Sequence, residues 1–173
     1  SSVTISIGGF QNAIAEAVGR AQPLGAQAGD ELRLVTSNSM AAGNAPEGAA
    51  GMVETNVNIA AVTMNGDAIT SCVIDAVQAQ VSFDGQGQLL TDLSAPVPSK
   101  NDRGADYGMG AVSSIGKEWN EQAAAFAAYV TGKTLDEVAG IAVDEATKPA
   151  EADLASSVTI SIGGFQNAIA EAV

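Results

Sequence analysis

The chain has 173 residues, of which 46% are hydrophobic and only 4% aromatic, and 7 basic against 20 acidic residues give a formal net charge of −13. This length suffices for one domain with a buried core, and the charge excludes nucleic-acid binding, which needs clustered Lys and Arg. Because the chain has no histidine, Ser-His or Cys-His catalysis and histidine metal sites are excluded within it.

The first predicted element, residues 1–18, recurs letter for letter as residues 156–173. In each copy three apolar residues alternate with Thr and Ser, which is typical of a half-buried strand. A Gly-Gly pair then precedes apolar residues at helical spacing. Each copy therefore predicts a strand followed by a short helix, and an exact repeat with so long a period indicates tandem copies of a whole domain.

We expect residues 1–18 to end a preceding unit, residues 19–155 to form the main domain, and residues 156–173 to complete this unit. The start at Ser1, without an initiator Met or signal peptide, indicates a processed chain or a fragment. Three arrangements stay open. Each copy docks in its own place, or one copy fills a neighbouring unit's position head to tail, which gives a fibre if the contact does not close. Alternatively, the segment is a shared boundary that occurs twice because the chain exceeds one period.

The side chains expected to make inter-unit contacts are apolar residues of the two copies. They are Val3, Ile5, Ile7, Phe10, Ile14, Val158, Ile160, Ile162, Phe165 and Ile169.

The middle of the chain predicts an antiparallel meander. A first strand is expected at residues 32–36, followed by a loop that continues to residue 51. Residues 55–63 alternate and lead into Asn65-Gly66, a type I′ hairpin signal. Further strands are expected at residues 69–77, 80–83 and 88–93, with a turn at residues 84–85.

Two helices follow a polar loop at residues 99–110. Residues 116–131 place Trp119, Ala123, Phe126, Ala127 and Val130 on one apolar face, with Glu118, Glu121 and Gln122 elsewhere. Thr134 and Glu137 predict a capping box for a helix over residues 135–139. The expected fold class is α+β, with the meander packed against a few helices and the strand–helix segment at both ends.

Several residue patterns have a chemical and a structural interpretation. Ser114 and Lys117 have the S-x-x-K spacing of serine acyl enzymes, but no partner motif accompanies them, so Ser114 is interpreted as a helix N-cap. Residues 84–88 lack the remaining ligands of a calcium loop and are interpreted as a hairpin turn.

Three further features involve titratable side chains. Asn101, Asp102 and Asp106 are interpreted as a solvated loop rather than a calcium site. Cys72 lies in an apolar run and is expected to be a small buried hydrophobe. Asp75, in the same run, is expected on the wet face of the sheet; if buried instead, its pKa should rise.

Most of the chain resembles secreted or lipid-anchored repeat proteins of anaerobic, clostridia-like bacteria, often described as putative lipoproteins. The resemblance rests on Asn58-IAAVTMNGDAITSCVIDAVQAQ, residues 93–100, Asp106-YGMGAVSSIGKEWNEQAAAFAAYVTGKTLDEVAGIAV and Ala152-DLASSVTISIGGF. It implies an exported, extracellular or cell-surface setting and no established activity.

Residues 62–69 and Gly110-Ala-Val-Ser-Ser-Ile are distantly similar to the FMN-binding domain superfamily. That family attaches flavin through a Thr, where this sequence offers Ser113 or Ser114. The similarity implies a flavin site with these serines, together with Tyr107, Trp119 and the loop at residues 108–114.

Two functions are therefore expected from different classes. The first is a non-enzymatic surface repeat whose partners are copies of itself, in a tandem array or a head-to-tail filament, with no cofactor and no metal. Because no apolar run reaches the roughly 18 residues of a membrane span, this segment is not expected to insert directly into a membrane. The second is an FMN- or small-ligand-binding module of a surface electron-transfer system.

Overall fold

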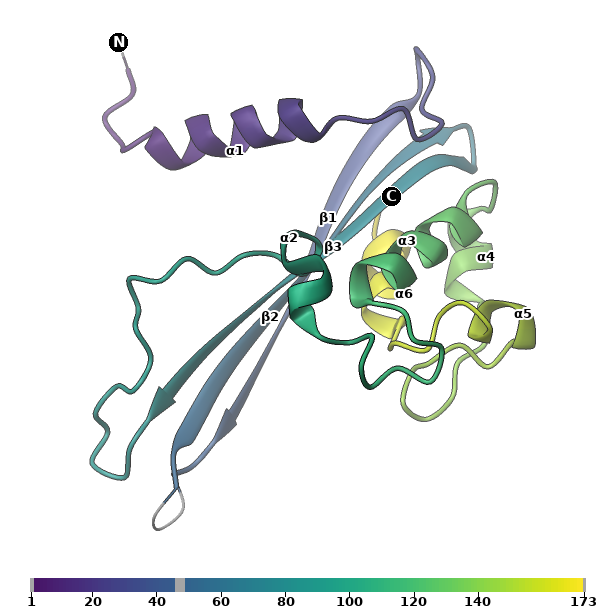
Figure 1. Ribbon diagram of the computed structural model, residues 1–173. Helices are drawn as coiled ribbons and strands as arrows, with labels where there is room; N and C mark the ends of the chain where they lie inside the picture. Colours follow the sequence, from purple (N-terminus) through teal and green to yellow (C-terminus); the bar gives the residue numbers. More distant parts are fainter. Residues whose placement is uncertain (1, 46–48, 173) are drawn as a thin grey trace.

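The computed structural model describes residues 2–45 and 49–172. Its centre is an antiparallel sheet with strand order β1-β2-β3, formed by β1 (Glu31–Gly43), β2 (Gly51–Asn65) and β3 (Ala68–Phe83). A group of helices lies on one side of this sheet, and the far ends of the strands extend beyond them (Figure 1). The fold is therefore α+β, and the predicted meander is confirmed.

The strands are fewer and longer than the sequence predicts. Residues 69–77 and 80–83 belong to one strand, because β3 pairs with β2 from Ala68 to Phe83 with a single irregularity at Thr63/Met64. The prediction of a strand at residues 88–93 is wrong, since only an isolated bridge between Phe83 and Leu89 is found there. β1 continues to Gly43 through residues expected in a loop. Its last six residues are exposed, so burial imposes no alternation on them.

The hairpin between β2 and β3 turns one residue later than predicted. Asn65 pairs with Ala68, so the two turn residues are Gly66 and Asp67. Gly66 has φ 60°, whereas Thr147 is the only non-glycine with positive φ among the described residues. Positive φ at the first turn residue alone fits a type II′ turn, in which glycine takes that position.

Five helices accompany the sheet: α2 (Lys100–Arg103), α3 (Trp119–Val130), α4 (Leu135–Ala139), α5 (Ala152–Ala155) and α6 (Gly163–Ala170). A 3₁₀ turn, Gly104–Tyr107, follows α2 within the predicted polar loop. The remaining helix, α1 (Gly8–Arg20), stands apart near the N-terminus (Figure 1) and has no buried residue.

The two predicted helices are confirmed, with one correction at the start of α3. α4 has the predicted bounds and the Thr134–Glu137 capping box. α3 begins at Trp119, after a capping box between Glu118 and Glu121. The prediction that Ser114 caps this helix is wrong, because Ser114 lies in a turn that precedes Gly116, whose φ is 64°.

The core lies between the inner face of the sheet and the helices. Ala60, Val62 and Met64 of β2 alternate with less buried neighbours, as expected for a strand with one covered face. The buried apolar side chains from other elements complete the cluster: Ile69, Cys72, Ile74, Ala76, Trp119, Ala123, Phe126, Ala127, Val130, Val138, Ile141, Leu154, Val158, Ile160, Ile162, Phe165, Ala168, Ile169 and Ala172. Residues 158–172 thus supply a large share of the core.

Within the described residues, no helix combines the length and apolar character that crossing a membrane requires.

Replacing Thr134 with Ala should lower the free energy of unfolding by about 1 kcal/mol, because the hydroxyl oxygen that accepts from the backbone N–H of Glu137 is lost. Urea unfolding followed by circular dichroism measures this change. Thr134→Ser is the control and should retain most of the stability. Equal losses in both variants would show that the cap does not stabilise α4.

Candidate functional site

The two identical segments lie in opposite environments. In the C-terminal copy Val158, Ile162 and Ile169 are fully buried, and Ile160 and Phe165 are nearly so. In the N-terminal copy their counterparts Val3, Ile5, Ile7, Phe10 and Ile14 are all exposed, with Ile14 at 65% against 0% for Ile169. Sequence alone therefore does not decide burial here: the apolar side chains of residues 158–172 pack into the core, and those of residues 3–14 do not.

We call the site that residues 156–172 occupy the segment slot and define it by the elements that contact α6. These include α4, the strands β1 and β2, and the aromatic residues of α3. At the start of α6 the Phe165 ring meets Trp119 edge-on, with ring centroids 5.8 Å apart, and Phe126 with centroids 6.2 Å apart. Such aromatic contacts add to the burial of the ring.

The glycine pair at the start of α6 allows a close approach to the slot. A Cβ on Gly164 would lie 2.6 Å from the Asn58 side-chain nitrogen, and one on Gly163 would lie 3.0 Å from Thr147 Cβ. At the matching positions of α1, Gly8 and Gly9 have no atom within 4 Å of a built Cβ. A side chain at either glycine of the C-terminal copy would therefore displace a neighbouring side chain, whereas the N-terminal copy has room for one.

The first half of the C-terminal copy corrects the strand prediction. Its side chains alternate between buried and more exposed as expected, yet residues 157–162 belong to no strand. The Gln122 side chain replaces a partner strand, since its Oε1 accepts from the backbone N–H of Thr159 (2.8 Å) and of Ile160 (3.2 Å). Residues 3–7 are irregular as well, and no element pairs with them in the described structure.

Gln122 also corrects the predicted face of α3. It was expected away from the apolar side chains but is fully buried. Its Nε2 donates to the carbonyl of Lys117 (2.9 Å) and to Ser113 Oγ (3.2 Å). A buried amide with all these partners satisfies backbone groups that would otherwise be unpaired. The spacing of Gln122 from Trp119 and Phe126 was the only sequence signal of this burial.

Two further polar contacts hold the end of the segment. Gln166 Nε2 donates to the carbonyls of Val138 (3.0 Å) and Ile141 (2.9 Å), at the C-terminal end of α4. Arg33 Nη1, from β1, donates to the carbonyl of Ala172 (2.5 Å). The slot therefore recognises both the apolar side chains and the backbone of the segment.

A cleft of about 480 Å³ adjoins the slot and bears on the flavin expectation. Tyr107 and Trp119 line it, with Lys100 Nζ 4.9 Å and 5.2 Å from their ring centroids. Ser113 and Ser114 are not among its described lining residues. The Ser113 hydroxyl instead contacts Gln122 and Thr159, so the residues present do not fit a covalently attached flavin in this cleft.

The remaining candidate residues are buried or take part in hydrogen bonds and ion pairs within the domain. Cys72 is buried, as predicted, and burial raises the pKa of its thiol to about 12. Asp75 is half-buried rather than fully on a wet face, and its Oδ1 accepts from the backbone N–H of Asn101 (3.1 Å). Asp102 pairs with Arg20. Asp84 Oδ1 accepts from the backbone N–H of Gln86 and Gln88, which forms the predicted turn.

No group of three or more potential metal ligands occurs in the described part of the chain. Comparisons of the chain with protein-family models, with curated proteins and with solved structures found no match.

Replacing Phe165 with Ala should lower the free energy of unfolding by about 3–5 kcal/mol, because a buried aromatic ring is lost and a cavity remains. Phe10→Ala is a matched control in the same local sequence, and it should leave the stability nearly unchanged because Phe10 is exposed. Thermal and urea unfolding of both variants measure the difference. Similar losses at the two positions would contradict the assignment of the slot to the C-terminal copy.

Proposed function

We propose that the chain is a non-enzymatic structural unit of an extracellular or cell-surface repeat assembly, which joins copies of itself head to tail through the 18-residue segment. One observation carries the proposal: the same sequence fills the slot at one end of the chain and is exposed, with its apolar side chains unpacked, at the other. The exposed copy has every side chain that the slot recognises, including Gln11 at the position that corresponds to Gln166.

Burial explains why the exposed copy would bind a second slot. Removing one Val, Ile or Phe side chain from water contributes about 1.5–3 kcal/mol. The N-terminal copy exposes six of these side chains: Val3, Ile5, Ile7, Phe10, Ile14 and Val18. In a tandem array, residues 1–18 complete the slot of the unit before them. Between separate chains, they complete any slot that lacks its own C-terminal copy.

The acidic composition and the resemblance to exported repeat proteins support the surface setting. With a net charge of −13, neighbouring units repel one another except where a specific contact holds them, which favours soluble and regular assembly.

A second candidate function rests on the cleft beside the slot. Tyr107, Trp119 and two lysines, Lys100 and Lys148, line it, which suits a small aromatic or anionic ligand. An absorbance scan of the purified protein, followed by titration with FMN, tests this candidate. A flavin band or saturable FMN binding would favour it over a purely structural unit.

A chain truncated to residues 1–155 tests the proposed function, because it keeps the exposed copy and has an empty slot. We expect linear polymers whose length grows with concentration, seen by sedimentation velocity and negative-stain microscopy. Phe10→Ala in the truncated chain should abolish them, since this ring would now occupy the position of Phe165.

Two controls complete the experiment. Residues 19–155 alone should not polymerise, and an excess of the synthetic 18-residue peptide should cap the polymers of the longer chain. A truncated chain that stays monomeric at every concentration, or that the peptide does not bind, would refute the proposed function.

A further inference from the structure

The connection between the exposed helix and the sheet is itself packed against the domain. Residues 21–30 lead from α1 to β1 and are almost all exposed by area, yet the chain from Arg20 to Asp30 lies against the domain at three separate places. We call residues 19–30 the joint, because they connect the repeated segment to the unit that follows it.

The first contact is an ion pair at the end of α1. Arg20, the last residue of the helix, pairs with Asp102 of α2. The pairing raises the pKa of the Arg20 guanidinium, with the hydrogen bond to Asp102 as the largest cause. Arg20 also lies 3.7 Å from Glu16, one turn back on the same helix. This exposed ion pair places the end of α1 beside α2, and the apolar side chains of α1 stay exposed.

At the second place the joint borders an apolar cleft rather than packing directly, and Leu24 stays 49% exposed. Leu24 and Gln22 line a cleft of about 470 Å³ together with Cys72 and Ile74 of β3 and Ala127 of α3. β3 is an edge strand of the sheet, and the joint runs beside it across this cleft.

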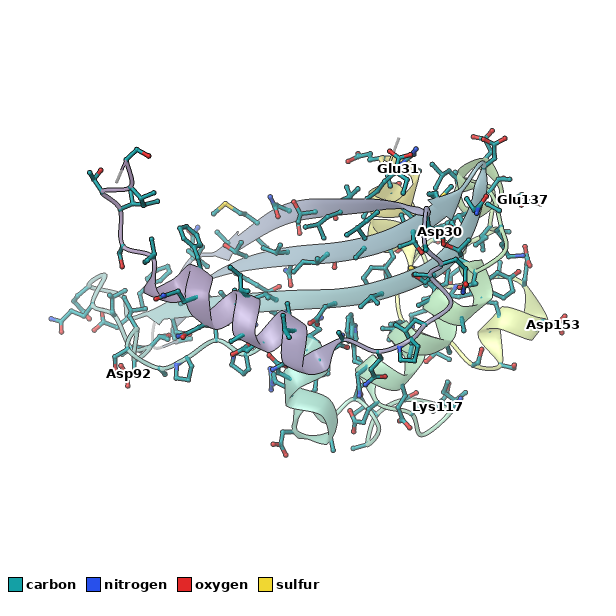
Figure 2. The ribbon with its side chains drawn as sticks, turned by 90° about the horizontal axis from the view of Figure 1, so that it is seen from above. Asp30, Glu31, Asp92, Lys117, Glu137 and Asp153 are labelled. Atoms are coloured by element: carbon teal, nitrogen blue, oxygen red, sulfur yellow. The ribbon has the colours of Figure 1, made fainter. Side chains whose placement is uncertain are left out.

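The third contact fixes the backbone of the joint where it turns toward β1. Gly25 has φ 113°, and a Cβ at this position would lie 2.6 Å from the Thr70 carbonyl oxygen. Asp30, labelled at the start of β1 in Figure 2, accepts from Thr70 Oγ1 (2.6 Å) and Asn65 Nδ2 (3.1 Å). The Thr70 hydrogen bond is the largest cause of the lowered pKa of Asp30.

From these contacts we infer that the joint is a fixed connector that holds α1 in one orientation and presents its exposed apolar face to the segment slot of a second copy of this chain. This inference rests on the proposed function, since it takes the partner to be another unit. α1 belongs to the slot of one unit and the joint is anchored on the next. The two units therefore keep a set angle, and the assembly is a stiff rod of repeating orientation rather than a flexible string.

The length of α1 supports this geometry. α1 shows that the helix of the segment can continue beyond Val18 into the joint, as far as Arg20. Where residues 156–173 are followed by the joint sequence, the helix in the slot therefore runs directly into the ion pair with Asp102. Only a short stretch of backbone therefore separates the slot of one unit from the Arg20–Asp102 ion pair on the next.

Double electron–electron resonance on the full chain tests the inference. Spin labels are placed at Gln11→Cys on α1 and at Asp153→Cys on α5, two exposed positions on different sides of the joint. Cys72 can stay, because burial protects its thiol from labelling. We expect a single narrow distance distribution. A broad distribution, as from a freely moving helix, would overturn the inference.

Variants then assign the restraint to the joint. Two variants should each broaden the distance distribution. Gly25→Val cannot keep the close approach to Thr70, and Asp102→Asn removes the ion pair. Asp92→Asn, which removes one charge far from the joint, should retain the narrow peak. Circular dichroism melts confirm that each variant is folded. A narrow peak that survives both joint variants would also overturn the inference. A mobile α1 would leave polymerisation of the truncated chain possible, so the two proposals fail separately.

Discussion

The burial of residues 158–169 against the inner face of the sheet is the contact on which the rest of the domain depends. The segment packs against β1, β2 and α4, and its Phe165 ring contacts both Trp119 and Phe126 of α3. Without the segment, the slot would leave those side chains in water. Gln122 Oε1 would lose its backbone donors, and the carbonyls of Val138 and Ile141 would lose the Gln166 amide. A domain built in this way is incomplete until an 18-residue segment is supplied, and the chain contains that segment twice.

Because the segment occurs twice in different environments, the two ends of the molecule are different. One end holds a filled slot, and the other holds an exposed segment of identical sequence on a joint anchored by Asp102, Gly25 and Thr70. A surface that binds its own sequence in a copy of itself makes a heterologous contact, which continues indefinitely unless geometry closes it. In the proposed account, the slot supplies the affinity between units and the joint supplies their orientation.

The sequence predicts much of the fold because local periodicity and capping chemistry agree with the final packing. Val62 and Ile69 in the meander, the apolar face of α3 and the Thr134 capping box could all be read from short windows. The environment of each copy could not be predicted in this way, because two identical stretches of sequence give identical local predictions. The buried role of Gln122 was missed for a related reason: a polar side chain on a helix is buried only when distant backbone groups need its hydrogen bonds.

Amide hydrogen exchange by NMR tests the central claim most directly, since the backbone amides of Ile14 and Ile169 have identical neighbours and therefore identical intrinsic exchange rates. Ile169 should exchange only through global unfolding, and Ile14 should exchange orders of magnitude faster because no tertiary contact protects its helix. Equal protection at the two positions would contradict the account, because it would mean that the two copies occupy equivalent environments.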